Sequence, residues 1–150
     1  MLDIDDYQWA KDILKNLDFF SHCSEEDILA LVESMEKNHY KAGSTILFQG
    51  EISNRLHLVR SGSVGIWKSA SGQKTLVAEL GPGKYFGEIS LMTPISATAS
   101  VKAKDETEIL SLSYESLEFA FRKHPEEMKI IQKKIEERMQ SRQAAPPPAG

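Results

Sequence analysis

The run from Phe86 to Val101, FGEISLMTPISATASV, carries the residue types of this chain that are best suited to hold a ligand. Gly87 lets a backbone approach a ligand closely, and N–H groups at a helix start attract anions. Glu88 beside that position would repel a phosphate, so its carboxylate is better suited to accept a hydrogen bond from a sugar hydroxyl. Alone, Phe86-Gly87-Glu88 is weak evidence, since a glycine-dependent turn with a surface glutamate is the commoner explanation.

Other reactive side chains form no recognisable catalytic or metal-binding pattern. His22, His39, His57 and His124 are scattered, with no HExxH or CxxC-like spacing, so no metal site is predicted and each is expected to be solvated or locally hydrogen-bonded. GxSxG and Walker-type motifs are absent, and the single Cys23 is expected to be a small buried hydrophobe. The sequence therefore predicts a protein with no catalytic residues, which is not an enzyme.

Length and composition indicate one globular domain. The chain has 150 residues, 41% of them hydrophobic and 27% charged, with a net charge of -4, which argues against a general nucleic-acid-binding surface. No segment is apolar over the length of a bilayer, the acidic N-terminus does not resemble a secretory signal, and one cysteine cannot form an internal disulfide. We expect a soluble cytoplasmic protein that binds neither membrane nor nucleic acid.

The 86–101 run must be positioned by the surrounding elements, and the predicted type of these elements changes along the chain from helix to strand and back to helix. Helical spacing at 7–17 and 19–36 predicts N-terminal helices within about 5–37, with Ser24 as an N-cap and Asp27 three residues later. Short apolar segments separated by glycine turns predict an antiparallel sandwich or barrel over about 40–113, and SASGQK predicts a hairpin turn. The domain is expected to span 1–142, followed by a disordered tail at 143–150.

Helical spacing returns over about 114–142. YESLEFAFRKH is one helix, and Pro125 begins the last one, on which Met128, Ile131, Ile135 and Met139 share a face. This face predicts either packing on the domain itself or contact with a partner. A homodimer through Ile131, Ile135 and Met139 is one prediction, and packing within the chain explains the stripe equally well.

In this order of elements, the segments YKAGSTILFQGEISNRLHLVRSGSVGIW, ELGPGKYFGEISLM and ATASV resemble the cyclic nucleotide-binding domain superfamily. That superfamily includes the catabolite activator protein, the regulatory subunit of cAMP-dependent protein kinase and the cyclic-nucleotide-gated channels. The resemblance covers about residues 10–140. It implies a mainly β fold with flanking helices, namely an eight-stranded, jelly-roll-like β-roll, a phosphate-binding cassette at 86–101, and a last helix that acts as a movable lid.

The resemblance also assigns roles within the cassette. Glu88 takes the ribose hydroxyls, and Gly87, Ile89 and Ser90 offer backbone groups near the phosphate. Thr98 occupies a position where a hydroxyl favours contact with guanine or phosphate. The remaining matches are Leu91, the apolar anchor, and the closing Ala99, Ser100 and Val101.

Ala97 departs from the pattern, because the family places there the arginine that pairs with the cyclic phosphate. A charged hydrogen bond contributes about 1.5–3 kcal/mol, so its absence predicts about 10- to 150-fold weaker binding. Arg55, Arg60 and Arg122 are the other candidate cations, and for Arg60 an outward-facing side chain is expected.

These features predict a stand-alone sensor that binds cAMP or cGMP, has no cofactor, and signals through its C-terminal helix to an unknown effector protein. From the chain length we expect no helix-turn-helix, kinase or channel domain after that helix, so that any output would pass through contacts with another protein. The alternative prediction is a degenerate module that has lost the nucleotide and serves as a protein-interaction or scaffold unit.

Overall fold

The computed structural model describes residues 2–92 and 95–144, which form ten strands and five helices. The helices are α1 (Ile4–Asn16), α2 (Glu25–Glu33), α3 (Glu88–Met92), α4 (Tyr114–Ala120) and α5 (Pro125–Ala144). The strands are β1 (Glu36–Tyr40), β2 (Thr45–Leu47), β3 (Ile52–Ser53), β4 (Arg55–Ser61), β5 (Val64–Ala70), β6 (Gln73–Leu80), β7 (Tyr85–Phe86), β8 (Ile95–Ser96), β9 (Ser100–Ala103) and β10 (Thr107–Ser113). None of the described helices combines the length and the apolarity needed to cross a bilayer.

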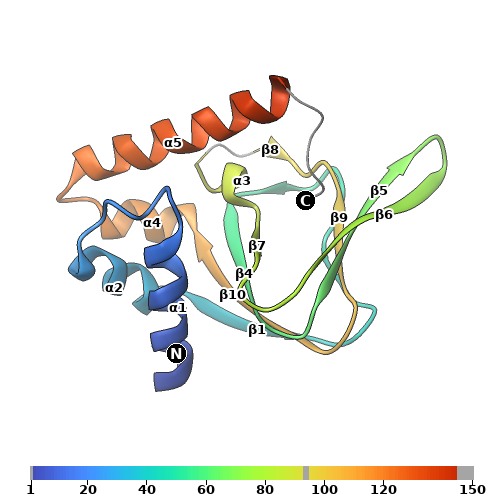
Figure 1. The fold of residues 1–150 in the computed structure, drawn as a ribbon, viewed down its shortest axis with the longest axis horizontal. Coiled ribbons are helices and arrows are strands. Elements are labelled where there is room, and N and C mark those ends of the chain that lie inside the picture. The colour runs from blue at the N-terminus through green and yellow to red at the C-terminus, as the bar shows by residue number, and fades with distance from the viewer. Residues whose placement is uncertain (1, 93–94, 145–150) are drawn as a thin grey trace.

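The strands form two four-stranded antiparallel sheets, in the orders β1-β10-β4-β7 and β2-β9-β5-β6. Helices α1, α2, α4 and α5 lie on one side of this β-roll, and the β5–β6 hairpin extends away from them (Figure 1). The predicted β-roll with flanking helices is confirmed. The predicted eight strands correspond to the two four-stranded sheets, and β3 and β8 form an additional short pair. No closed barrel forms within the described ranges.

Local sequence signals explain several of these elements. The Ser24 side chain accepts a hydrogen bond from the Asp27 N–H at 3.1 Å, as the N-cap prediction requires. At the tip of the β5–β6 hairpin, Ser71 and Gly72 both have positive φ angles, 53° and 79°, which is the signature of a type I′ turn.

Two boundaries differ from prediction. The second helix ends at Glu33, because β1 begins at Glu36 and pairs with β10, so tertiary pairing prevails over helical spacing. The last helix runs to Ala144, beyond the predicted end at 142. The rest of the predicted tail, 145–150, lies outside the described residues.

One sheet separates two hydrophobic cores. Because side chains alternate across a strand, β4 and β10 contribute to both cores. The residues that face the helices are Leu56, Leu58, Leu110 and Leu112, and those that face the interior of the roll are Val59 and Ile109. Ile131 and Ile135 of α5 complete the helical core.

Candidate functional site

The cassette begins at a backbone corner that only glycine can form. Gly87 follows β7 with a φ of +87°, and a Cβ placed there would lie 2.5 Å from the carbonyl oxygen of Arg55. This approach holds the start of α3 against β4, and the Gly87 carbonyl accepts a hydrogen bond from the Leu91 N–H at 3.2 Å. Glycine is therefore required here by both conformation and space, for the contact with β4, and the close approach of its backbone to a ligand stays a prediction.

Glu88, the predicted ribose acceptor, lies at the start of α3 and is only 2% exposed. Its carboxylate faces α5, where Arg138 Nη1 lies 4.0 Å from Glu88 Oε1. The Arg138 guanidinium also pairs with the Asp18 carboxylate and lies over the Phe19 ring, 5.1 Å from its centroid. The Arg138 guanidinium of α5 thus lies between Glu88 of the cassette and Asp18 of the segment after α1.

Behind Glu88, α3 is anchored by apolar contacts. Ile89 and Leu91 are buried and Ser90 is half-buried, as expected for a short helix held against the domain. α5 packs across α3 (Figure 1). The predicted anchor role of Leu91 agrees with its place in the helical core.

The far end of the cassette returns to sheet structure. The Ala97 N–H donates to the Glu51 carbonyl at 2.8 Å, and the Ala97 carbonyl accepts from the Gly50 N–H at 2.8 Å. The Ala97 side chain packs against the core of the roll. Thr98 is exposed, Ala99 is buried, and the Ser100 hydroxyl accepts a hydrogen bond from the Gln49 N–H at 2.8 Å. Cassette positions 93–94 lie outside the described residues.

His57 supports the corner from the interior of the roll. Its Nδ1 lies 2.8 Å from the Ser111 hydroxyl, and its ring stacks on Phe86 with centroids 4.8 Å apart. Burial, followed by the nearby charge of Arg55, lowers the pKa of His57 to about 4. This histidine is therefore neutral near pH 7, in agreement with the predicted local hydrogen bond.

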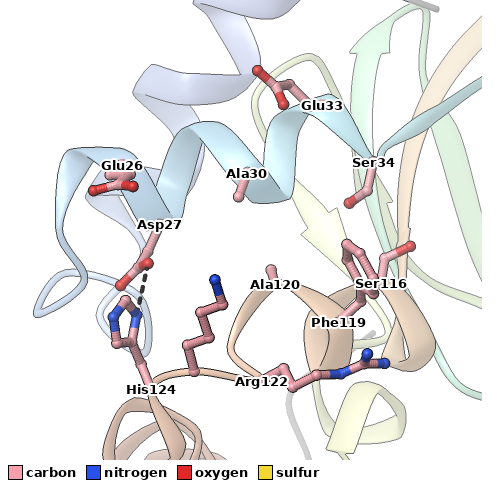
Figure 2. Close-up of a pocket in the computed structure, with 11 residues that line it drawn as sticks. Glu26, Asp27, Ala30, Glu33, Ser34, Ser116, Phe119, Ala120, Arg122 and His124 are labelled. Atoms are coloured by element: carbon pink, nitrogen blue, oxygen red, sulfur yellow. Dashed lines mark hydrogen bonds and ion pairs between the residues drawn. The ribbon is translucent and has the colours of Figure 1, made fainter.

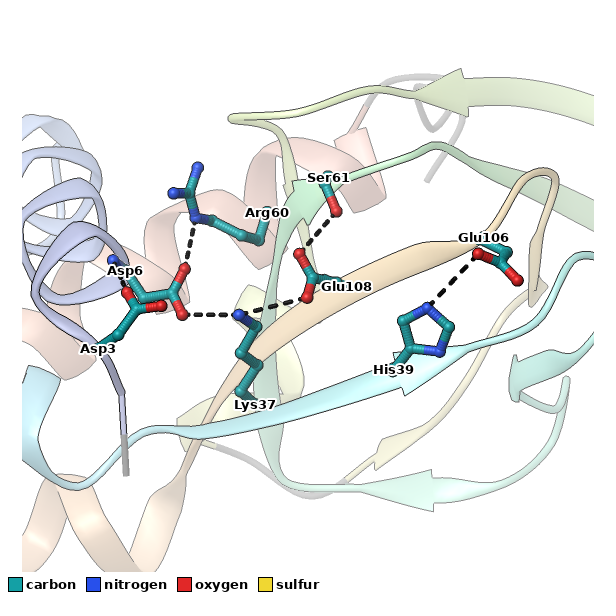
Figure 3. A network of polar contacts seen from close by, with 8 residues as sticks. All are labelled: Asp3, Asp6, Lys37, His39, Arg60, Ser61, Glu106 and Glu108. Carbon is teal, nitrogen blue, oxygen red and sulfur yellow. Dashed lines mark hydrogen bonds and ion pairs between the residues drawn. The ribbon is translucent and has the colours of Figure 1, made fainter.

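The three candidate replacement cations make contacts elsewhere. Arg60 Nε donates to Asp6 at 2.8 Å (Figure 3), and its guanidinium lies 5.0 Å from the centroid of the Trp9 ring. Arg55 Nη1 lies 3.5 Å from the carboxylate of Glu36. Neither of these guanidinium contacts involves the cassette, and the contacts of Arg60 agree with the outward direction expected for its side chain.

Arg122 lines a groove of about 530 Å³ between α2 and the turn that follows α4 (Figure 2). Its guanidinium lies 5.1 Å from the centroid of the exposed Phe119 ring. Across the same groove His124 Nδ1 lies 3.2 Å from Asp27 Oδ1. Arg122, one of the candidate cations, therefore has its contact in this groove and not at the cassette.

The predicted stripe on α5 packs mainly within the chain. Ile131 and Ile135 are 0% and 2% exposed, whereas Met128 and Met139 are half-buried. The two isoleucines therefore do not form an open surface of the single chain. Packing on the domain itself accounts for them, and dimerisation stays a prediction.

Comparison with known proteins gives the family. The family model for the cyclic nucleotide-binding domain matches residues 37–124, which is more than half of the chain. The chain belongs to the cyclic nucleotide-binding domain family. A cyclic AMP receptor protein from Thermus thermophilus is 32% identical over 113 residues, covering 75% of this chain and 52% of that protein. The chain thus spans about half the length of this curated relative.

Solved structures agree with this family fold. The N-terminal domain of a transcriptional regulator from Streptomyces coelicolor A3(2) has a TM-score of 0.76 at 26% identity, covering 89% of this chain and 96% of that one. The Thermus thermophilus catabolite activator protein has a TM-score of 0.67 at 30% identity, covering 84% and 60%.

The matched stretch contains the whole cassette but neither Asp18 nor Arg138. The position of Arg138 beside the cassette could not be predicted from the sequence, since Arg138 is one of several cations on a polar helix and its partner Asp18 is 120 positions away. No local spacing signals such a contact. Membership of the cyclic nucleotide-binding domain family was thus readable from the sequence motifs, whereas the contact of the cassette with the last helix was not.

Proposed function

We propose that this chain is a regulatory module that binds cAMP or cGMP at the 86–101 cassette and signals to a partner protein through α5. The observation that carries the proposal is the Glu88 carboxylate, buried beside the corner at Gly87. A simple glycine turn would be followed by a surface glutamate, whereas this carboxylate is buried at the start of α3 and lies within reach of Arg138 on α5. Acceptance of ribose hydroxyls gives this carboxylate a function.

The contact between Glu88 and Arg138 supports a route from ligand to helix. Ribose hydroxyls at Glu88 would compete with Arg138, whose guanidinium lies 4.0 Å away on α5. A ligand that weakens this contact would remove one of the interactions that hold α5 against the cassette. By linkage, a partner that displaces α5 would change nucleotide affinity by the same factor.

Ala97 sets the expected strength of binding. The family arginine is replaced by Ala97, and the candidate cations Arg55, Arg60 and Arg122 make their contacts elsewhere, so the charge of a cyclic phosphate would be compensated less. We expect weak binding, about 10- to 150-fold below that of the same pocket with an arginine.

Calorimetric titration with cAMP and with cGMP, up to millimolar concentration, tests the proposal. We expect weak saturable binding to the wild type, tightening by about 10- to 150-fold in Ala97→Arg. Glu88→Gln should reduce binding in both backgrounds. Glu106→Gln is the control, because Glu106 is an exposed carboxylate on the other side of the roll, 3.9 Å from His39 (Figure 3).

The second candidate is a degenerate module that acts through protein contacts alone. Ala97 favours it, because its N–H is already bonded to the Glu51 carbonyl and its side chain packs against the roll core. The same titration separates the two. Absence of binding in both the wild type and a folded Ala97→Arg variant would exclude the sensor and leave the scaffold.

A further inference from the structure

Three side chains of types that can bind a metal ion lie together where the segment before α2 approaches the start of α5. His22 and Cys23 precede α2, and Glu127 lies in the first turn of α5. His22 Nε2 lies 3.8 Å from Cys23 Sγ and 3.1 Å from Glu127 Oε2. All three ligand atoms lie within 4.8 Å of one another.

The cluster is largely enclosed and its hydrogen bonding is incomplete. Cys23 is 8% exposed, and the side chains of His22 and Glu127 are 18% and 28% exposed. Among the described residues, His22 Nδ1 and Glu127 Oε2 are buried atoms with no hydrogen-bond partner. The carboxylate oxygen thus lies close to the imidazole without the geometry of a hydrogen bond. An ion bound between His22 Nε2 and Glu127 Oε2 would give this carboxylate oxygen a partner, whereas His22 Nδ1 is the other ring nitrogen and would not contact that ion.

We propose that His22, Cys23 and Glu127 bind a zinc-class divalent cation. Thiolate, imidazole and carboxylate together suit Zn²⁺, whereas Mg²⁺ and Ca²⁺ prefer oxygen ligands alone. In a tetrahedral site with Zn–N and Zn–O near 2.0–2.1 Å and Zn–S near 2.3 Å, ligand atoms lie about 3.3–3.6 Å apart. The two separations from His22 Nε2, 3.1 Å to Glu127 Oε2 and 3.8 Å to Cys23 Sγ, bracket this range, and the separation of the sulfur from the carboxylate is at most 4.8 Å. Water can take the fourth position, as in other three-residue zinc sites.

The electrostatic surroundings also favour a cation. Burial, followed by the negative charges of Glu127 and Asp27, raises the pKa of the Cys23 thiol to about 12, and Lys134 opposes this rise. The two carboxylates that disfavour a thiolate attract a divalent cation. Metal binding would release the thiol proton to solvent as the Zn–S bond forms.

Such a site would join two parts of the fold that the chain does not connect locally. Glu127 belongs to the first turn of α5, and Arg138 lies near the other end of the same helix, at the cassette. A metal would fix the beginning of α5 to the segment before α2. The end that contacts Glu88 would keep its freedom to respond to a ligand.

Titration of the chelator-treated full chain with Co²⁺, followed by competition with Zn²⁺, tests the site. We expect one ion per chain, the visible bands of tetrahedral Co²⁺, and a near-ultraviolet thiolate-to-cobalt charge-transfer band that Zn²⁺ abolishes. Cys23→Ser should remove the charge-transfer band, and Glu127→Gln should weaken binding at least about 10- to 100-fold, since even indirect partners of metal ligands have effects of this size.

His39→Gln is the matched control, because His39 is an exposed histidine on β1 and should leave the spectrum unchanged. Circular dichroism establishes that each variant is folded. Should Cys23→Ser fail to fold, Glu127→Gln decides, since its side chain is partly exposed. Absence of the charge-transfer band in the wild type, or a Co²⁺ affinity unchanged in folded Glu127→Gln, would overturn the proposal.

Discussion

At the scale of single residues, the corner at Gly87 combines two separate demands. Its φ of +87° disfavours any side chain, and the Arg55 carbonyl occupies the space that a Cβ would need. Gly43 has nearly the same φ, +88°, but open space around it. Alanine at Gly43 would therefore introduce conformational strain alone, whereas alanine at Gly87 would introduce conformational strain and steric overlap.

We predict that Gly87→Ala destabilises the fold by more than Gly43→Ala. Gly43→Ala should lower the free energy of unfolding by about 1–2 kcal/mol, the usual effect of a left-handed residue with a side chain. Gly87→Ala should lower it by a further ~1–3 kcal/mol, because the backbone of β4 must shift. Urea denaturation measures both, and equal losses would mean that the close contact with Arg55 is relaxed at little cost.

At the scale of elements, α5 is a polar helix whose contacts with the rest of the chain include two buried isoleucines, Ile131 and Ile135, and the side chains of Lys134 and Arg138. Ile135 is 2% exposed, whereas Ile130 on the same helix is 39% exposed. Substitution of alanine at Ile135 removes a buried side chain of α5, whereas the same substitution at Ile130 removes a side chain that is partly exposed. The comparison tests whether α5 docks on its own chain.

We predict that Ile135→Ala lowers the free energy of unfolding by about 2–5 kcal/mol, as is usual for a buried isoleucine. Ile130→Ala should change it by less than about 0.5 kcal/mol. Chemical denaturation gives the stabilities, and sedimentation gives the oligomeric state. If Ile135→Ala instead left stability intact and dissociated a dimer, the homodimer prediction would replace docking on the same chain.

The elements also show what local sequence signals can and cannot predict. Ser24 and the Ser71-Gly72 turn were predictable, because a cap and a type I′ turn depend on a few adjacent residues. The end of α2 was not, because the pairing of Glu36 with Ser111 of β10 decides it. The cassette residues were readable as one continuous motif. Arg138, and the approach of Glu127 to His22, depend on packing between distant segments.

At the scale of the molecule, a polar network joins α1 to the first sheet. Lys37 Nζ lies 2.7 Å from Asp6 Oδ2 and 3.2 Å from Glu108 Oε2, and Arg60 donates to the other oxygen of Asp6 (Figure 3). Burial by itself would raise the pKa of Asp6, but hydrogen bonds from Lys37 and Arg60 outweigh it and lower the pKa. Hydrogen bonds from Ser61 and Lys37 lower the pKa of Glu108.

We predict that this network makes the protein sensitive to acid. Carboxyl groups with a lowered folded-state pKa stabilise the fold above their unfolded values, 3.8 for Asp6 and 4.5 for Glu108. That contribution is lost as the pH falls through the folded-state values. Asp6→Asn should therefore flatten the acid side of the stability profile, measured as melting temperature against pH. Asp5→Asn, at an exposed position in the same helical turn, should not, and equal profiles for the two variants would contradict the role of the network.

The sheet formed by β1, β10, β4 and β7 is covered by apolar side chains on both sides. A fragment cut at residues 37 and 124, where the family match begins and ends, would keep the 86–101 cassette and lose α1, α2 and α5. Leu56, Leu58, Leu110 and Leu112 would then be bared to water, and exposed apolar patches of this kind promote aggregation. The smallest autonomous unit of this molecule is therefore larger than its recognisable motif.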